Sequence, residues 1–193
     1  MKKTFVKWLA LSLALCCLIP LFAGCSIFED KVTRTAKKIV TGGNFTVRVE
    51  DDDDSYSAKV ADGAYMTQSE DEKYICYYDE EAEKYKAYSR KDTDGWERED
   101  FSLYGFGDVY ADDDFGLYQL YMFINFPDAF TKTDDGVYTY KDSDGDTITI
   151  KSAKTGLKVT EVWTSGITGK TYTTTYSFTN IGKTVVDIPD AIK

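Results

Sequence analysis

The sequence contains no histidine and only four cysteines, and both shortages narrow the chemistry open to this chain. Without histidine there can be no Ser-His-Asp or Cys-His catalytic arrangement and no zinc site with histidine ligands. Cys16, Cys17 and Cys25 lie close to the N-terminus, and Cys76 stands alone in the rest of the chain. Because Cys76 lies in an apolar, strand-like run, we interpret it as a small buried hydrophobe.

Basic residues are also few, since 23 Lys and Arg face 33 Asp and Glu. Residues 1–24 contain three lysines and no carboxylate, so the remaining 169 residues hold 20 basic and 33 acidic side chains, a net charge of −13. A nucleic-acid partner is not expected, because phosphate binding needs clustered Lys and Arg. An anionic membrane surface also repels a chain with this net charge.

The N-terminus has the order of a secretory signal, with a basic start, an apolar run and small residues at its end. The segment Leu21-Phe22-Ala23-Gly24-Cys25 resembles the lipobox of bacterial lipoproteins, with Phe22 where that pattern usually has leucine. The resemblance implies cleavage before Cys25, a diacylglycerol on its sulfur, and a cell-membrane anchor on the extracytoplasmic side. Two acyl chains hold a protein stably, at about 0.8 kcal/mol per buried CH₂.

Two other interpretations of this segment remain, ordinary secretion and an uncleaved anchor. An uncleaved anchor needs about 20 apolar residues, whereas the run from Trp8 to Ala23 has 16 and contains Pro20. We therefore divide the chain into a lipoprotein signal peptide (1–24), the lipidated Cys25 with a short tether (25–30), and a single domain (31–193).

The hydrophobic pattern of the domain predicts one short helix followed by many strands. Val32, Ala36, Ile39 and Val40 recur at helical spacing, with Asp30 as cap and Gly42-Gly43 as stop, so we expect a helix over 31–41. Alternating patterns and turn signals then predict strands at 44–50, 56–61, 64–69, 73–79, 84–90, 96–101, 137–141, 147–152, 157–164, 171–179 and 184–188.

One apolar segment, residues 103–130, interrupts the strands. We expect a helix at about 114–126, with Asp112–Asp114 at its N-terminus and Pro127 at its end. The segment either plugs the sheet and completes the core, or forms a lid over a cavity for an apolar ligand.

The chain ends on YSFTNIGKTVVDIP, residues 176–189, which resembles the last hairpin of LolA/LppX-like lipoproteins. That resemblance implies an α+β fold, a strongly curved antiparallel β-sheet (an open half-barrel) closed by an N-terminal helix and a helical insertion. It also implies a concave face that binds a lipid or lipopeptide. The expected function is therefore non-enzymatic binding of a lipid-like or other apolar ligand at the outer face of the cytoplasmic membrane.

The expected ligand-binding residues come from the apolar insertion and from the facing strands: Tyr118, Tyr121, Met122, Phe123, Phe126, Phe45, Val47, Tyr172 and Tyr176. The alternative function is a tethered interaction or structural module that binds another cell-envelope protein. An exposed aromatic patch outside the concave face would favour that alternative.

No metal, cofactor or enzymatic activity is expected, and we expect a monomer. The run Asp142–Asp146 suggests a calcium loop, but an EF-hand needs Gly at the sixth position and Glu at the twelfth, where this chain has Thr147 and Ala153. A hairpin turn explains the run better. A glycosidase-like acid/base pair would need two carboxylates that stand out, and no pair does.

Replacing the proposed lipidation site tests the anchor. Cys25→Ala should abolish metabolic labelling of the protein by palmitate, because the thioether needs the Cys25 sulfur. Labelling of the wild-type chain is the control, and labelling that survives the substitution would disprove this assignment.

Overall fold

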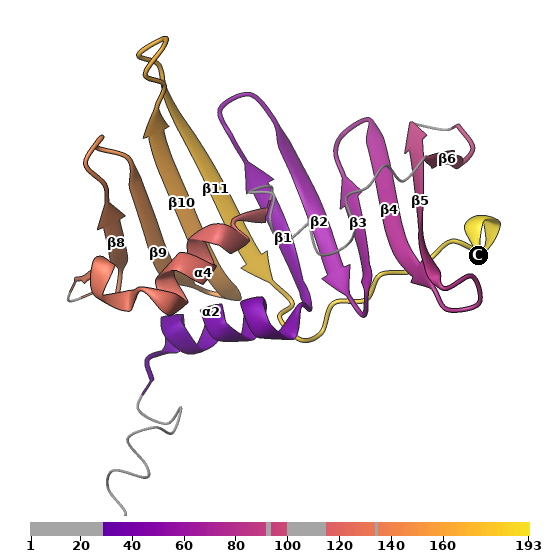
Figure 1. Ribbon diagram of the computed structural model, residues 1–193, viewed down its shortest axis with the longest axis horizontal. Coiled ribbons are helices and arrows are strands. Elements are labelled where there is room, and N and C mark those ends of the chain that lie inside the picture. Colours follow the sequence, from indigo (N-terminus) through magenta and orange to yellow (C-terminus); the bar gives the residue numbers. More distant parts are fainter. Residues whose placement is uncertain (1–28, 92–93, 100–114, 134) are drawn as a thin grey trace, which may run out of the picture.

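The computed structural model describes residues 29–91, 94–99, 115–133 and 135–193. The lipobox with Cys25 and the expected cap at Asp112–Asp114 lie outside these residues. The described chain forms one open antiparallel sheet of eleven strands in the order β6-β5-β4-β3-β2-β1-β11-β10-β9-β8-β7 (Figure 1). Two α-helices, α2 (Lys31–Gly42) and α4 (Leu117–Asn125), pack against the half of the sheet that contains β9–β11 (Figure 1).

The strands form two meanders, each made of neighbours in the sequence. The first contains β1 (Phe45–Glu50), β2 (Ser55–Ala61), β3 (Ala64–Gln68), β4 (Glu72–Asp79), β5 (Lys84–Lys91) and β6 (Glu97–Glu99). The second contains β7 (Thr131–Lys132), β8 (Tyr138–Lys141), β9 (Thr147–Ala153), β10 (Gly156–Thr164) and β11 (Thr171–Thr179). The pairing of β1 with β11, from Thr46 opposite Thr179 to Glu50 opposite Thr175, joins the two meanders.

The main core lies between the helices and the sheet. Side chains alternate along each strand, so Phe45 and Val47 of β1 face the helices together with Phe178 of β11. Phe45 and Phe178 meet edge to face with ring centroids 5.5 Å apart. From α4, Phe123 packs edge to face on Phe130 at 5.2 Å. Burying each such aromatic side chain contributes about 1.5–3 kcal/mol.

The C-terminal segment, residues 180–193, covers the opposite face of the first meander. Phe45 and Val47 of β1 face the helices, so Thr46 between them points to the opposite face. On that face, the hydroxyls of Thr46 and Thr184 lie 3.0 Å apart. Farther along, the segment ends in a 3-10 helix, η3 (Asp190–Ile192), whose Ile192 carbonyl accepts a hydrogen bond from the Tyr77 hydroxyl. A second core cluster forms here: Ala64, Ile75, Tyr77 and Ile192.

The prediction of a strand at 184–188 is wrong, because this stretch is extended but does not form a strand. A final hairpin would need a free edge on β11, and both edges of β11 are already paired, with β1 and with β10. The chain instead crosses the face of the sheet, where the Asn44 side chain pairs with the backbone of Thr184.

Most other expected elements are confirmed. Helix α2 begins at the expected cap, where the Asp30 Oδ1 accepts the Thr33 N–H at 3.0 Å, and ends at Gly43 in the left-handed conformation. Helix α4 is shorter than expected and is followed by a 3-10 helix, η2 (Pro127–Ala129), which begins at Pro127. The two-residue β7 was not expected, since such a short strand leaves no periodic pattern.

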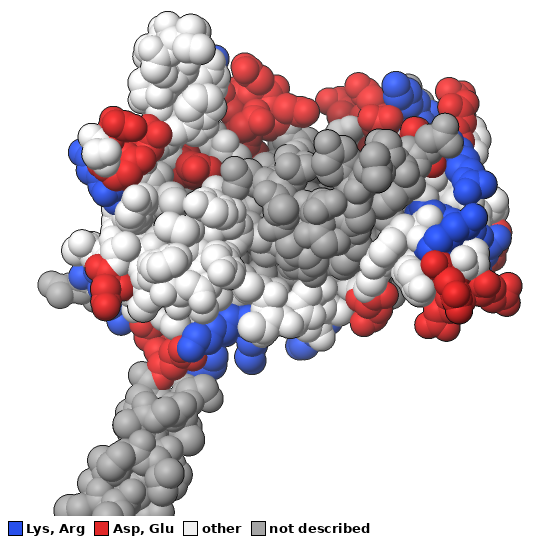
Figure 2. All heavy atoms as spheres, viewed as in Figure 1, with Lys and Arg blue, Asp and Glu red and all other residues white. Residues whose placement is uncertain are grey.

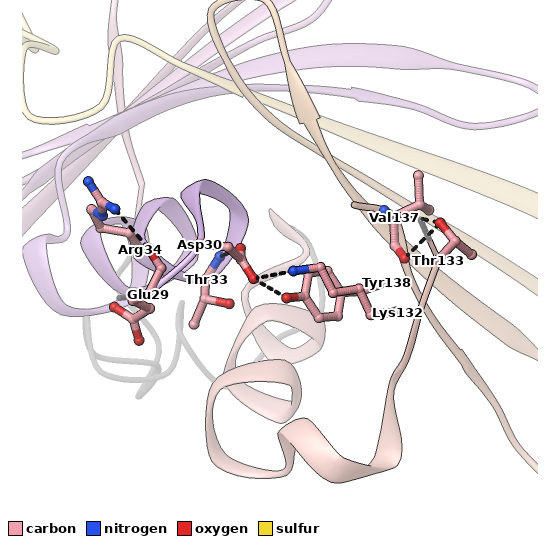
Figure 3. Close-up of polar contacts among 8 residues, drawn as sticks. All are labelled: Glu29, Asp30, Thr33, Arg34, Lys132, Thr133, Val137 and Tyr138. Carbon is pink, nitrogen blue, oxygen red and sulfur yellow. Dashed lines mark hydrogen bonds and ion pairs between the residues drawn. The ribbon is translucent and has the colours of Figure 1, made fainter. Parts of the chain in front are cut away.

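Asp30 joins α2 to the β7–β8 hairpin and so holds the helix on the sheet (Figure 3). Its Oδ2 accepts a hydrogen bond from the Tyr138 hydroxyl and another, at 3.0 Å, from the Lys132 ammonium. Partial burial alone would raise the pKa of Asp30. The hydrogen bonds from Tyr138, from the Thr33 N–H and from Lys132 outweigh burial and lower this pKa to about 2.

The low pKa of Asp30 predicts an acid-dependent loss of stability. A lowered carboxyl pKa stabilises the fold above the unfolded pKa, near 3.8, and that stabilisation is lost as the pH falls through about 2. Asp30→Asn keeps a capping side chain but removes the charge. We expect it to lower the free energy of unfolding by about 1 kcal/mol between pH 5 and 8, since the side chain is 32% exposed and solvent screens the charge.

Urea denaturation at a series of pH values measures this difference, which should shrink between about pH 4 and 2. Asp30→Ala is the matched variant, because it also removes the cap and should lose about 1 kcal/mol more at every pH. A difference between wild type and Asp30→Asn that does not change with pH would contradict this account of Asp30.

Candidate functional site

A cleft of about 550 Å³ opens on the helix-bearing face of the sheet, where the two meanders meet. Strands β10 and β11 form its floor, and the ends of β1, β2 and β9 flank it. Eight residues line the cleft: Val49, Asp51, Tyr56, Asp146, Glu161, Trp163, Thr174 and Tyr176. It thus combines aromatic surfaces with three carboxylates.

The aromatic part of the cleft centres on Trp163, whose side chain is 40% exposed. Its ring stacks on Tyr172, directly opposite on β11, with centroids 4.6 Å apart and planes 18° apart. On the same ring of Tyr172, the Lys170 ammonium lies 4.6 Å from the centroid. Stacking against a fixed neighbour restricts the Trp163 side chain, so the cleft offers a preformed apolar surface.

Hydrogen bonds fix the three carboxylates of the cleft. The Gln119 side chain of α4 donates from Nε2 to Glu161 Oε2 at 2.8 Å. Asp146 accepts the Thr164 N–H at 2.9 Å, and Asp51 accepts backbone N–H groups of its own turn. Figure 2 shows acidic side chains gathered along the upper edge of this face, where the β1–β2 and β8–β9 hairpins end.

Gln119 is an unusual residue for its place, because it is only 1% exposed and lies on the buried side of α4. Its Nε2 bonds to Glu161, but its Oε1 is buried and has no hydrogen-bond partner among the described residues. A buried unpaired amide oxygen is unfavourable by about 1–3 kcal/mol. The sequence offered a signal here that the pattern analysis missed, since Gln119 is the one amide in an apolar stretch, LYQLYMFI at 117–124.

Gly116 places the start of α4 directly on the cleft wall. It caps α4 in the left-handed conformation, at φ 68°. A Cβ at this position would lie 2.6 Å from Cγ of Tyr176, so only glycine allows this approach of the backbone to the ring. The position of Tyr176 in the cleft therefore depends on Gly116.

The structure does not bring the nine expected ligand-binding residues into one surface. Phe45, Val47 and Phe123 are at most 1% exposed and belong to the packed core, where a ligand cannot reach them. Only Tyr176 lines the cleft, and Tyr172 supports it by stacking on Trp163.

The remaining expected residues lie on α4 and just after it. Tyr118, Tyr121 and Phe126 are 51%, 52% and 54% exposed, and Met122 is half-buried. Helix α4 thus completes the core with one side, through Leu117, Leu120 and Phe123, and presents aromatic side chains to solvent on the other. The pattern analysis could not divide the helix in this way because nearly every position of α4 is apolar.

The acidic run Asp142–Asp146 forms a turn. Asp142 Oδ1 accepts the N–H groups of Asp144, Gly145 and Asp146, each at 2.9 Å, which confirms the hairpin turn. Among the described residues, no group of three or more His, Cys, Asp or Glu side chains is placed to hold a metal ion. Cys76 is fully buried, and burial raises its pKa to about 12, so the thiol stays protonated and unreactive.

Comparison of the chain with protein-family models, with curated proteins and with solved structures finds no match. In the described part of the chain, no helix has both the length and the apolar character needed to cross a bilayer.

Two glycine substitutions test how Gly116 holds the cleft wall. Gly116→Ala should destabilise the protein by at least about 2 kcal/mol, since the new methyl group meets Tyr176 and the backbone is left-handed. Gly136→Ala is the matched control, because Gly136 has φ 73° and open space around it. The Gly136→Ala variant should lower the free energy of unfolding by only about 1 kcal/mol. Equal losses in thermal denaturation would show that the Tyr176 contact has no effect.

Proposed function

We propose that this chain is a lipid-anchored domain at the extracytoplasmic face of the cytoplasmic membrane, and that its cleft binds a lipid-like or other apolar ligand without catalysis. The observation that carries the proposal is the cleft itself. A concave surface with a preformed aromatic wall and a few fixed polar groups is the usual form of a small-molecule site. Its volume falls in the range of such sites, about 300–1,000 Å³.

The carboxylates of the cleft narrow the class of ligand. Asp51, Asp146 and Glu161 disfavour an anionic head group and favour a cationic one. A quaternary ammonium or similar cation near the exposed face of Trp163 gains about 0.5–2 kcal/mol from the ring. We therefore propose an amphiphile with a positively charged head group and an apolar tail.

An open antiparallel sheet with two helices on one face agrees with what the LolA/LppX-like resemblance implies. We propose that the sheet is the half-barrel of that family. Its concave side is here largely filled by core side chains such as Phe45 and Phe123, which leaves the cleft as the place for a ligand.

A second candidate function has its own observation. Tyr118, Tyr121 and Phe126 form an exposed aromatic surface on and beside α4, away from the cleft lining. Exposed aromatic patches of this kind mark protein–protein contacts. They favour the alternative of a tethered module that binds another cell-envelope protein.

Calorimetric titration with short-chain amphiphiles tests the cleft. Octyltrimethylammonium should bind, and octyl sulfate should not, because the carboxylates repel the sulfate. Trp163→Leu should weaken octyltrimethylammonium binding about fivefold, which corresponds to the loss of about 1 kcal/mol of cation–π energy. Glu161→Gln should also weaken octyltrimethylammonium binding, because it removes a negative charge from the cleft.

Two controls separate the cleft from other sites. Trp96→Leu removes a tryptophan that packs on Arg90, outside the cleft lining, and should not change the affinity. The double variant Tyr118→Ser, Tyr121→Ser should also bind normally. If octyl sulfate binds as well as the cation, or if Trp163→Leu behaves like Trp96→Leu, the cleft is not the ligand site.

A further inference from the structure

The negative net charge of the domain is not spread evenly, and α2 carries the exception. The helix contains four basic residues and no acidic one. All four are exposed: Lys31, Arg34, Lys37 and Lys38. They lie opposite the buried residues Val32, Ala36 and Ile39, so the solvent side of α2 is a continuous basic surface. Figure 2 shows blue side chains along the lower edge of the molecule, where α2 runs in Figure 1.

The acidic hairpin turns lie at the other ends of the strands. The β1–β2 turn contains Asp51–Asp54, and the β8–β9 turn contains Asp142 and Asp144. Both turns lie at the upper edge in Figure 1, whereas α2 runs along the lower edge. The half of the domain that bears α2 is therefore basic at one end of its strands and acidic at the other.

The basic helix is also the element nearest to the proposed anchor. The described chain begins at Glu29, four residues after Cys25. Four residues span at most about 14 Å when fully extended. A chain that is anchored at Cys25 thus keeps the start of α2 close to the lipid head groups.

We propose that the basic surface of α2 docks on anionic lipid head groups, and that this contact orients the domain with the acidic hairpins and the cleft directed away from the bilayer. The occupant is a lipid surface because charge complementarity and the position of the anchor both point to it. Each Lys or Arg near an anionic membrane strengthens such a contact on the order of 5-fold. This inference rests on the N-terminal anchor of the proposed function and not on the ligand of the cleft.

Neighbouring carboxylates cancel only part of the basic surface. Glu29 pairs with Lys37, whereas Asp30 is held by Lys132 and Tyr138, so Lys31, Arg34 and Lys38 carry the proposed contact. The acidic β4–β5 turn, residues 79–83, lies near the far end of the sheet. It is five strand spacings from β10, against which α2 packs, or about 24 Å. That distance is about three Debye lengths at physiological salt.

Energy transfer in reconstituted vesicles tests the orientation. The full chain, with a fluorescent amino acid in place of Thr41 on α2, is inserted into phosphatidylcholine vesicles with or without phosphatidylglycerol, and a labelled head group serves as acceptor. Transfer from position 41 should be high with phosphatidylglycerol, and it should fall without that lipid or at high salt. A probe at Ile167, in the exposed β10–β11 hairpin, should show low transfer throughout.

Charge neutralisation supplies the matched comparison. The triple variant Lys31→Gln, Arg34→Gln, Lys38→Gln should lower the ratio of docked to undocked protein roughly 100-fold, at about 5-fold per cation. The control, Lys84→Gln, Lys91→Gln, Lys141→Gln, changes the net charge equally at exposed strand ends outside α2 and should leave the ratio unchanged. The proposal is overturned if both variants have the same effect, or if phosphatidylglycerol and salt leave the wild-type transfer unchanged.

Discussion

The pairing of β1 with β11 is the constraint on which the rest of the structure depends. The paired residues Thr46 and Thr179 are 133 positions apart, whereas all other strand pairs join neighbours in the sequence. This one ladder makes a single sheet of two local meanders, and on its helix side it brings Val47 of one meander opposite Phe178 of the other. The core combines the two meanders in the same way, because the apolar sides of α2 and α4 belong to one cluster with buried residues of β1, β2 and β9–β11.

The cleft follows from the same pairing. Its lining takes Val49 and Tyr56 from the first meander, and Glu161 and Trp163 from the second. Each meander supplies at least one carboxylate and one aromatic ring to this lining. Helix α4 then fixes two points of the wall, through the Gln119 bond to Glu161 and through Gly116 against Tyr176. The cleft and the core thus share Val49 of β1 and Tyr176 of β11, which lie opposite each other where the two meanders pair.

Local patterns predicted most of the elements but little of the site. The alternation in 44–50 and the capping signals of α2 act within one turn or one strand, so they can be recognised in the sequence. The course of 184–188 depends on whether β11 has a free edge, which only the strand order decides. Likewise, the expected ligand-binding residues include Phe45 and omit Trp163, because only packing makes the first side chain part of the core and leaves the second accessible. The Cys25 anchor, which lies outside the described residues, stays a prediction.

The central place of β11 has a consequence for how the protein is made. A ribosome completes residues 171–179 after every other strand, yet β11 lies in the middle of the sheet between β1 and β10. Until then, the first meander has an unpaired edge at β1 and an uncovered apolar face, the state in which chains aggregate or pair with the wrong strand. A chain that ends before β11 therefore leaves two separate meanders instead of a nearly finished domain.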